Sequence, residues 1–514
     1  MKIFRKFKII LMFLVLFILC LIIYSEKWFL STWDSSIEFS AVVYQIFSPL
    51  KDVGREVMQA YVSSCIYPTL VICGICIIFY AVLHSVKKKF IFSWEIKIGS
   101  RDVIVHSDSR CEKVLSFISL VMVLGAMCIV VWQQAVSMGI MEYIEKISQH
   151  STIYEEKYVE PKEIAITFPE QKRNLIFIYL ESMETTYASV EAGGGKPINY
   201  IPELTELALD NVYFSDDEDF GGGSVCEGIG WTMAALLASS AGVPYQLDIR
   251  RNTADRYEKF FPGISTLGEI LRDNGYQNYF MCGSNIAFAG RGDFYSQHGD
   301  YTLLDINTAR NEGIVEKDYY NGFWGMEDEK LFKFAKEYLS DVSKRDEPFN
   351  FTLLTVDTHQ IDGYVCDYCS KQYDEQYANV ISCSSRQVFD FIKWIQDQPW
   401  YENTTVIITG DHLSMQPDFW NDIGGYERKT YNCFINLPDD VVPVKTRNRT
   451  FTMVDLFPST LAAMGAKIEG DRLGLGVNLF SGEPTIPEEI GFDEFNDELG
   501  HYSQYYFLHF VVGM

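Results

Sequence analysis

Basic residues are scarce in this sequence relative to acidic ones. It has 43 lysines and arginines against 69 aspartates and glutamates, which gives a formal net charge of −26. Nucleic-acid-binding proteins need a basic surface, so the composition excludes a nucleic-acid partner. The acidic excess indicates a solvated surface and by itself identifies no substrate. The sequence also lacks internal repeats and low-complexity stretches.

A signal-peptide cleavage site is also missing. The apolar stretch at about residues 9–24 follows several basic residues, but no small-residue cleavage site comes after it. We therefore expect a retained anchor. Two further apolar stretches, at about residues 67–83 and 115–132, are each close to the ~20 residues that a helix needs to cross a bilayer. The sequence thus predicts a transmembrane region of three helices over residues 1–135.

Loop charges predict the orientation of these helices. The loop between the second and third stretches has more lysines and arginines than the loop between the first and second. The positive-inside rule then places the N-terminus and the basic loop in the cytoplasm. We expect a multi-pass protein of the cell membrane, with a polar linker over residues 136–170 and an extracytoplasmic domain over residues 171–514.

Strand-like and helix-like patterns alternate along that domain. This alternation predicts an α/β fold with a mostly parallel central sheet, helices on both faces and a small C-terminal layer. The predicted strands are residues 174–180, 279–281, 349–356, 404–409 and 431–435, and the predicted helices include residues 201–209, 264–272, 329–339 and 384–398.

Two of the predicted strands end in residues that bind metals. The run TVIITGDH ends in Asp411 and His412, and the run NLIFIYLES ends in Glu181 and Ser182. Ligands collect at the carboxyl ends of parallel strands, and carboxylates with an imidazole suit a divalent cation. For Asp411 and His412 alone, a turn with a capping aspartate is the alternative. Glu181 favours the metal site.

A glycine-rich segment places a hydroxyl at the start of a helix. Residues 221–230 lead into an alanine- and leucine-rich stretch that begins near Thr232. The free N–H groups at a helix N-terminus favour an anion such as a phosphoryl group. A hydroxyl there acts as a nucleophile if a cation stabilises its alkoxide. The alternative is an ordinary threonine cap.

Six of the twelve cysteines fall in the predicted external domain. Cys366 and Cys369 have the spacing of half a zinc site, but no second cysteine pair or histidine pair accompanies them. An oxidising compartment permits disulfides. We expect a disulfide from this pair to Cys383.

Several short motifs occur in a fixed order along the external domain. They are LES at 180–182, IPELT at 201–205, GWT at 230–232, FAGRG at 288–292, WGM at 324–326, VDTH at 356–359, TGDH at 409–412 and RLGLGVNLFS at 472–481. This ordered set resembles the membrane-anchored phosphoglycerol transferases of the lipoteichoic acid synthase and osmoregulated-glucan group. That group belongs to the sulfatase branch of the alkaline phosphatase superfamily, and the resemblance covers roughly residues 174–481.

The resemblance implies one divalent cation, manganese foremost, with magnesium or zinc as alternatives. Its implied ligands are Glu181, Asp411, His412 and the nucleophile Thr232. Relatives often have a threonine at the place of Ile229, and this chain does not. Either Thr232 is the nucleophile, which we favour, or the chain has lost transferase chemistry.

The resemblance also implies residues that contact the substrate. His359 matches the substrate-binding histidine of the family and is a candidate to protonate a leaving group. Arg291, between two glycines, is a candidate phosphate ligand because its planar fork fits phosphate oxygens. His298 is a weaker candidate in the same loop.

The implied reaction moves a phosphoglycerol group from a phosphatidylglycerol-like lipid to an envelope glycan or a teichoic-type polyglycerol phosphate, through a phospho-threonine intermediate. The alternatives are a phosphoethanolamine transferase, a phosphodiesterase and an inactive homologue that binds glycan or lipid. Cys226 lacks the C-x-P-S-R or C-x-A-x-R context in which sulfatases make formylglycine, which argues against sulfatase activity.

Overall fold

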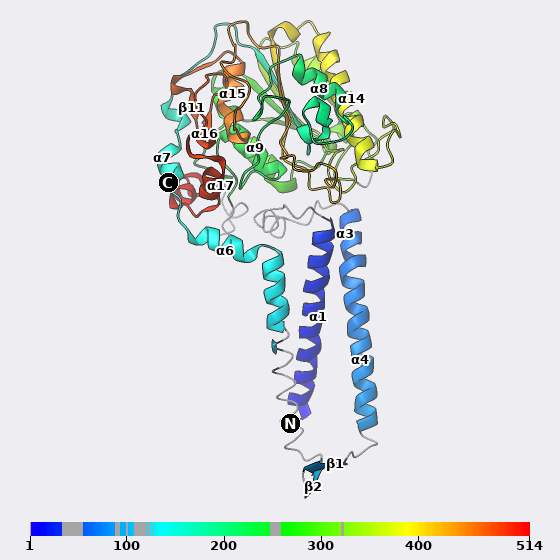
Figure 1. The fold of residues 1–514 in the computed structure, drawn as a ribbon. Coiled ribbons are helices and arrows are strands. Elements are labelled where there is room, and N and C mark those ends of the chain that lie inside the picture. The colour runs from blue at the N-terminus through cyan, green and yellow to red at the C-terminus, as the bar shows by residue number, and fades with distance from the viewer. Residues whose placement is uncertain are drawn as a thin grey trace. The chain divides into compact units, whose positions relative to one another are not determined.

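The computed structural model of the chain describes residues 2–32, 55–87, 93–98, 101–106, 121, 124–125, 127–246, 259–319 and 323–514 (Figure 1). The chain divides into two compact units. One comprises Met1–Thr32 and Arg55–Glu142, and the other contains Tyr143–Met514.

The smaller unit contains long apolar helices. The first two predicted segments lie in α1 (Lys2–Thr32) and α4 (Tyr67–Lys87). Within these helices and the turns that lead into them, Ile10–Thr32 and Met58–Val82 are long and apolar enough to cross a membrane. This unit also contains α3 (Arg55–Tyr61), the π-helical turn η2 (Val62–Ile66) and a hairpin of β1 (Ser93–Ile98) and β2 (Arg101–His106).

The third predicted segment, residues 115–132, lies partly outside the described residues. Its described end belongs to the helix Met127–Ser137. A bend of 68° separates this helix from α6 (Ile140–Ser148), and the two together form a third candidate span. The structure therefore shows two candidate spans, and three if this bent pair is one span.

A six-stranded sheet forms the centre of the larger unit, in the order β6-β5-β7-β4-β8-β9. All neighbouring pairs are parallel except β8 and β9, which are antiparallel. The prediction of a mostly parallel sheet is confirmed. The strands are β4 (Asn174–Leu180), β5 (Gln277–Cys282), β6 (Thr302–Leu304), β7 (Phe349–Leu354), β8 (Thr404–Gly410) and β9 (Asn432–Ile435).

Side chains of β4 alternate between two hydrophobic cores, one on each face of the sheet. Leu175, Phe177 and Tyr179 belong to one core, and the residues between them belong to the other. This is the two-residue period of a strand that is buried on both faces. The first core contains residues of α9 (Thr232–Ala241), α10 (Leu267–Asp273), α11 (Arg291–Gln297) and α15 (Leu456–Ala463), and the second contains residues of α8 (Pro202–Leu209), α12 (Ile306–Glu312), α13 (Asp328–Val342) and α14 (Gln376–Gln396). Figure 1 shows α9 with α15, and α8 with α14, on opposite sides of the sheet.

Small elements near the C-terminus complete the larger unit. Two short antiparallel pairs join β3 (Ile166–Thr167) to β10 (Lys467–Ile468) and β11 (Arg472–Leu473) to β12 (Gly476–Val477). The last helices are α16 (Ile486–Ile490), α17 (Phe492–Gly500) and the π-helical η11 (Tyr506–Val512).

Part of the predicted linker, residues 136–170, packs on this unit. In α7 (Ile153–Lys157), Ile153 and Tyr154 are buried. The ring of Tyr154 lies 5.2 Å from that of Tyr506 and 5.8 Å from that of Phe510. Two large apolar side chains thus fix this part of an otherwise polar segment to the core of the larger unit.

Candidate active site

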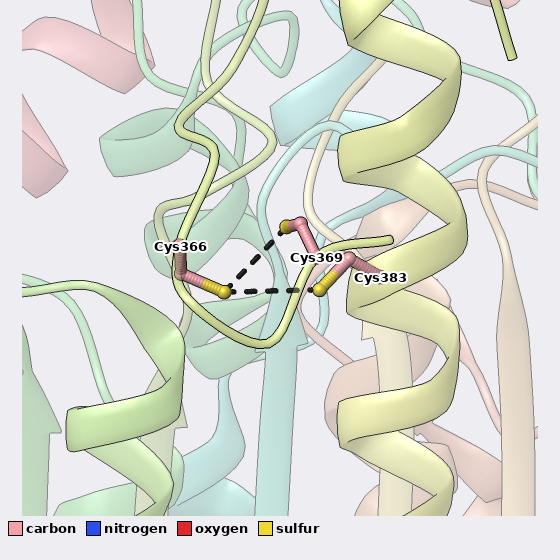
Figure 2. A group of neighbouring side chains, drawn as sticks. All are labelled: Cys366, Cys369 and Cys383. Carbon is pink, nitrogen blue, oxygen red and sulfur yellow. Dashed lines mark hydrogen bonds between the residues drawn. The ribbon is translucent and has the colours of Figure 1, made fainter. Parts of the chain in front are cut away.

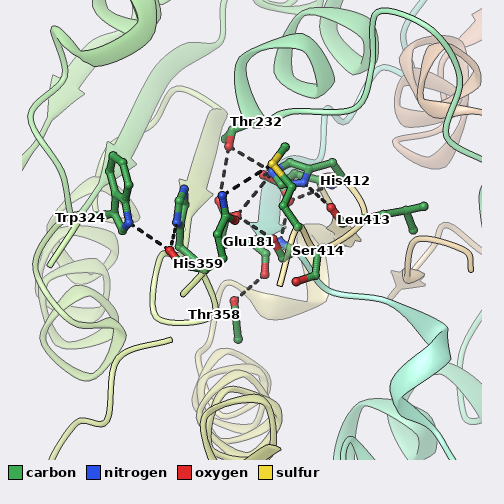
Figure 3. Close-up of polar contacts among 12 residues, drawn as sticks. Glu181, Thr232, Trp324, Thr358, His359, His412, Leu413 and Ser414 are labelled. Atoms are coloured by element: carbon green, nitrogen blue, oxygen red, sulfur yellow. Dashed lines mark hydrogen bonds and ion pairs between the residues drawn. The ribbon is translucent and has the colours of Figure 1, made fainter. Parts of the chain in front are cut away.

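Three metal-type ligands meet at the carboxyl ends of two neighbouring strands. Glu181 follows β4 and Asp411 with His412 follows β8, and the register pairs Leu180 with Gly410. One ligand atom from each of Glu181, Asp411 and His412 lies within 4.8 Å of the others. Figure 3 shows Glu181 and His412 side by side. All three side chains are buried. The structure thus brings together the residues that the strand-end motifs predict.

Backbone N–H groups orient Asp411. Its Oδ1 accepts hydrogen bonds from the N–H groups of Ser182 and His412, each at 2.8 Å. Its buried Oδ2 accepts no hydrogen bond. The glycine before it is required by packing, since a Cβ on Gly410 would lie 1.8 Å from the Met183 carbonyl oxygen. The segments around Met183 and Gly410 therefore pass close to each other. Because Oδ1 is engaged and Oδ2 is not, Oδ2 of Asp411 is the oxygen available to a ligand.

A backbone carbonyl orients His412. Its Nδ1 lies 2.8 Å from the Leu413 carbonyl oxygen, so Nδ1–H donates there. Its Nε2 lies 3.4 Å from Glu181 Oε1 and 3.5 Å from Asp411 Oδ2. A histidine that binds a metal through one nitrogen commonly donates its other N–H to such a partner.

Burial and the charges of neighbouring groups shift the pKa values of all three ligands. Burial and the neighbouring Glu181 raise the pKa of Asp411 to about 7. Burial opposes ionisation of Glu181 too, but His359 and His412 outweigh it and lower the pKa of Glu181 to about 2. Burial likewise opposes the His412 imidazolium, and Asp411 with Glu181 outweigh it and raise the pKa of His412 to about 10.

A divalent cation fits this set of donors. Two buried carboxylates repel one another, and Asp411 Oδ2 is a buried acceptor without a donor. A cation that binds the two carboxylates and His412 Nε2 removes both costs, and oxygen and imidazole ligands suit manganese, magnesium or zinc.

Thr232 is the first residue of α9 and points at the same centre. Trp231, in an extended conformation, precedes it as the N-cap. The Thr232 hydroxyl lies 3.4 Å from Glu181 Oε2 and 3.3 Å from His412 Nε2. Ile229, three residues earlier, is buried in a hydrophobic core instead. Of these two positions, the one whose side chain reaches the ligand cluster is Thr232.

A pocket opens beside Thr232 at the ends of β4, β5 and β7. Glu181, Thr232, Arg291, Trp324 and His359 are among its lining residues. Its wall also includes Ser284 and Phe288 from the segment after β5. Charged and aromatic groups therefore converge on a space next to the hydroxyl.

His359 stands between Trp324 and Glu181 in this pocket (Figure 3). Its ring centroid lies 4.4 Å from that of Trp324, and its Nδ1 lies 2.7 Å from the Gln360 carbonyl oxygen. The indole Nε1–H of Trp324 donates to the same carbonyl at 3.2 Å. Burial lowers the pKa of His359, with Glu181 acting in the opposite direction. Burial thus favours the neutral ring over the imidazolium. The Gln360 carbonyl engages Nδ1 and not Nε2.

Arg291 lines the pocket but is tethered. Its Nη2–H donates to Ser284 Oγ at 2.7 Å, and its Nε–H donates to the Phe288 carbonyl at 3.1 Å. The side chain is 6% exposed. These bonds fix the guanidinium in position, which is the arrangement that a preformed anion site requires.

His298 does not join the site. It follows α11 and is 1% exposed. Its Nε2 lies 2.6 Å from the Phe260 carbonyl oxygen, and its Nδ1 lies 3.4 Å from Glu269 Oε1. The predicted substrate-binding role of His298 therefore disagrees with its position, because both ring nitrogens are engaged away from the pocket lining.

Glu184, to which the sequence assigns no role, supports the loop after His412. It is fully buried and accepts two hydrogen bonds from Arg428, at 2.6 Å to Oε1 and 3.0 Å to Oε2. Its Oε1 also accepts the N–H of Ser414 at 2.7 Å. Only the burial of an acidic residue after a strand end hints at this function, and burial is not visible in one sequence.

Comparison with known proteins places this arrangement in context. Residues 173–466 match the family model described as sulfatase. The chain is 33% identical over 331 residues to phosphoglycerol transferase I of Escherichia fergusonii, covering 63% of this chain and 41% of that protein. It is 32% identical over 329 residues to the Shigella flexneri protein of that name, with the same coverage. The chain thus spans less than half the length of these curated relatives.

A solved structure resembles the chain over most of its length. This is the integral membrane protein lipooligosaccharide phosphoethanolamine transferase A from Neisseria meningitidis, with a TM-score of 0.50 and 12% sequence identity. The likeness covers 89% of this chain and 84% of that one. At this identity the likeness concerns the fold alone.

Proposed function

The chain belongs to the sulfatase family, and from this premise we propose that it transfers a phosphoglycerol group from a phosphatidylglycerol-like lipid to an acceptor of the cell envelope. The acceptor is an envelope glycan or a polyglycerol phosphate chain. One observation carries the proposal: the Thr232 hydroxyl lies 3.4 Å from Glu181 and 3.3 Å from His412 beside a pocket that contains Arg291 and His359. The identity to phosphoglycerol transferase I supports the choice of head group.

Glu181, Asp411, His412 and Thr232 would hold one divalent cation. We propose manganese, with magnesium or zinc as alternatives, since all three accept carboxylate and imidazole ligands. When bound, such a cation stabilises negative charge on a nucleophilic hydroxyl and on phosphoryl oxygens.

Thr232 is the proposed nucleophile. Its Oγ forms a bond to phosphorus as the bond from phosphorus to the diacylglycerol oxygen breaks. Glu181 Oε2, at 3.4 Å, is the nearest carboxylate oxygen to which the hydroxyl donates. The N-terminus of α9 supplies unpaired backbone N–H groups and a favourable dipole for the phosphoryl oxygens. An acceptor hydroxyl then displaces Thr232 in the second step.

His359 and Arg291 are the proposed substrate-binding residues. The neutral His359 ring donates Nδ1–H to Gln360, so its Nε2 is an acceptor for the proton of the attacking hydroxyl in the second step. A proton taken up from solvent on this nitrogen passes to the departing diacylglycerol oxygen in the first step, and the second step returns the ring to its protonated form. Arg291 offers its fixed guanidinium to the phosphate oxygens.

A membrane anchor suits a lipid donor. We propose that the N-terminal apolar helices, three in number, hold the chain in the cell membrane with the larger unit on the extracytoplasmic side. The two candidate spans and the bent third pair support this arrangement. An anchored domain stays near the head groups of the donor lipid.

The test uses the purified full-length chain in detergent micelles with manganese. We expect phosphatidylglycerol labelled in its head-group glycerol to leave a phosphoglycerol adduct on Thr232, located by peptide mass spectrometry. Thr232→Ala should lose the adduct and lower turnover by on the order of 10³-fold or more, whereas Thr232→Ser should keep a hydroxyl and retain the adduct.

Other outcomes identify the alternatives. An adduct that forms from phosphatidylethanolamine and not from phosphatidylglycerol would make the chain a phosphoethanolamine transferase. Head-group release without an adduct, and at an equal rate in Thr232→Ala, would remove Thr232 as nucleophile and indicate a phosphodiesterase. No release from either lipid, with the cation bound, would indicate an inactive homologue.

A further inference from the structure

Three cysteines meet where the loop after β7 packs on α14. Cys366 and Cys369 lie in the loop after β7, and Cys383 lies in α14 (Figure 2). Cys366 Sγ lies 3.5 Å from Cys369 Sγ and 3.8 Å from Cys383 Sγ. All three sulfurs lie within 4.8 Å of one another. The proximity of the pair to Cys383 agrees with the sequence prediction, but the cysteines are free, so the predicted disulfide is wrong.

The spacing of the sulfurs is that of ligands around one ion. A disulfide requires sulfurs about 2.0 Å apart. Two thiolates on a tetrahedral zinc, each about 2.3 Å from the metal, lie about 3.8 Å apart. The distances of 3.5 and 3.8 Å match the second arrangement.

The surroundings stabilise negative charge on one of the three sulfurs, that of Cys383. Gln387, one turn along α14, points its Nε2 at Cys383 Sγ, 3.4 Å away, and at Cys366 Sγ, 3.7 Å away. Cys383 and Gln387 are 1% and 6% exposed. Hydrogen bonds from the other two cysteines lower the pKa of Cys383 against its burial, and the amide of Gln387 and the charge of Arg386 add to this effect. Amide donors to thiolates are typical of the outer shell of a metal site.

We propose that Cys366, Cys369 and Cys383 bind a zinc ion. Three thiol protons are released as three thiolate–zinc bonds form, and no oxidant or reductant is needed. Thiolates are the soft ligands that select zinc, and three protein ligands leave one position of a tetrahedral shell for water. This ion is separate from the cation of the candidate active site, whose ligands are oxygen and imidazole nitrogen.

The zinc would fasten an active-site loop. The segment between β7 and α14 carries His359 near its start and Cys366 and Cys369 farther along. Thr358 donates to the Glu181 carbonyl at the start of the same segment. Through the zinc, Cys366 and Cys369 tie the middle of this segment to Cys383 in the long helix α14. The ion thereby restricts the loop that carries His359.

Cobalt substitution of the full-length chain in micelles tests the proposal. Cobalt bound to thiolates absorbs in the near ultraviolet through sulfur-to-metal charge transfer, which oxygen and nitrogen ligands do not produce. We expect this absorption in the reduced wild-type chain at one cobalt per chain, and competition by zinc. Cys383→Ser should lose it, and Cys433→Ala, which removes a buried thiol from β9, should keep it.

Two outcomes would overturn the proposal. One is a reduced wild-type chain that binds cobalt without the charge-transfer absorption, a result that does not depend on any variant. The other is a disulfide among the three cysteines in the chain as isolated, found by alkylation and mass spectrometry without reduction. Both results concern the sulfurs alone, so neither bears on phosphoglycerol transfer.

Discussion

Thr232 Oγ1 lies 3.3 Å from His412 Nε2, although 180 positions separate the two residues in sequence. The contact exists because α9 begins where β8 ends, above the edge of the parallel sheet. It places the hydroxyl beside two of the proposed metal ligands, the imidazole of His412 and the carboxylate of Glu181 at 3.4 Å. A helix N-terminus and a strand end thus build one reactive centre.

Asp411→Asn should stabilise the chain without metal and weaken metal binding. The asparagine keeps the Oδ1 that accepts the Ser182 and His412 N–H groups, and it removes a buried charge that Glu181 repels. In EDTA at pH 8 we expect a gain in unfolding free energy of about 1–2 kcal/mol. Manganese affinity should fall more than about 100-fold. Thermal unfolding with and without manganese measures both effects.

The control for this variant is Asp493→Asn, an exposed aspartate in the first turn of α17. It should leave the manganese-induced shift unchanged and should lower the metal-free stability by no more than about 1 kcal/mol, the usual contribution of an anion at a helix N-terminus. If Asp411→Asn bound manganese as tightly as the wild type, Asp411 would not be a ligand.

Most strands were predictable from the sequence because continuous apolar runs are typical of buried strands, whereas the three-residue edge strand β6 was not predicted. The prediction for β4 has the observed bounds, and β8 differs from its prediction by the terminal Gly410. The position of Thr232 at a helix start was predictable for a similar reason, since glycines precede it and helix-forming residues follow it.

Contacts between distant segments were not predictable. His298 follows the end of the helix that Arg291 begins, yet its ring nitrogens contact a backbone carbonyl and Glu269. Glu184 supports the loop after His412 through its ion pair with Arg428, which lies 244 positions away in sequence. Hydrogen-bond partners of this kind leave no local pattern, so a single sequence does not distinguish a buried structural histidine from one that meets the substrate.

Asp357→Asn should remove a pH-dependent loss of stability. Both carboxylate oxygens of Asp357 are buried without a hydrogen-bond donor, and burial together with Asp328 raises its pKa well above the usual value. Below about pH 4 the group is protonated in both states. As the pH rises, the unfolded chain ionises first, so the unfolding free energy falls until the folded-state pKa is reached.

The variant should therefore match the wild type near pH 4 and exceed it at pH 8, by roughly 2–4 °C in the unfolding midpoint. Thermal unfolding across this pH range in EDTA is the measurement. Asp374→Asn, an exposed aspartate before α14, should follow the wild-type curve. Parallel curves for Asp357→Asn and the wild type would contradict the raised pKa.

Glu184→Ala should destabilise the chain and loosen the loop after His412. It leaves the Arg428 guanidinium and the Ser414 N–H without their carboxylate in a buried site. Loss of one partner of a buried pair costs about 3–5 kcal/mol. Turnover should fall by about 10-fold to 100-fold while the metal still binds.

The matched control is Glu427→Ala. It removes an exposed carboxylate that pairs with Lys429, and it should have little effect. Equal stabilities of the two variants would refute this function of Glu184.

Trp324→Ala should release His359 from its fixed orientation. The indole packs 4.4 Å from the imidazole and donates to the Gln360 carbonyl that also receives His359 Nδ1–H. Without the indole the imidazole gains a second rotamer and the pocket gains water, so kcat should fall by about 10-fold to 100-fold. Trp324→Phe retains an aromatic face and loses only the N–H, so its kcat should lie between those of the wild type and the alanine variant.

The pH profile of kcat decides between positioning and simple loss of binding, because a freed, hydrated His359 titrates at a higher pH. An alanine variant that raises KM alone, with an unchanged pH profile, would show that Trp324 binds the substrate without positioning His359.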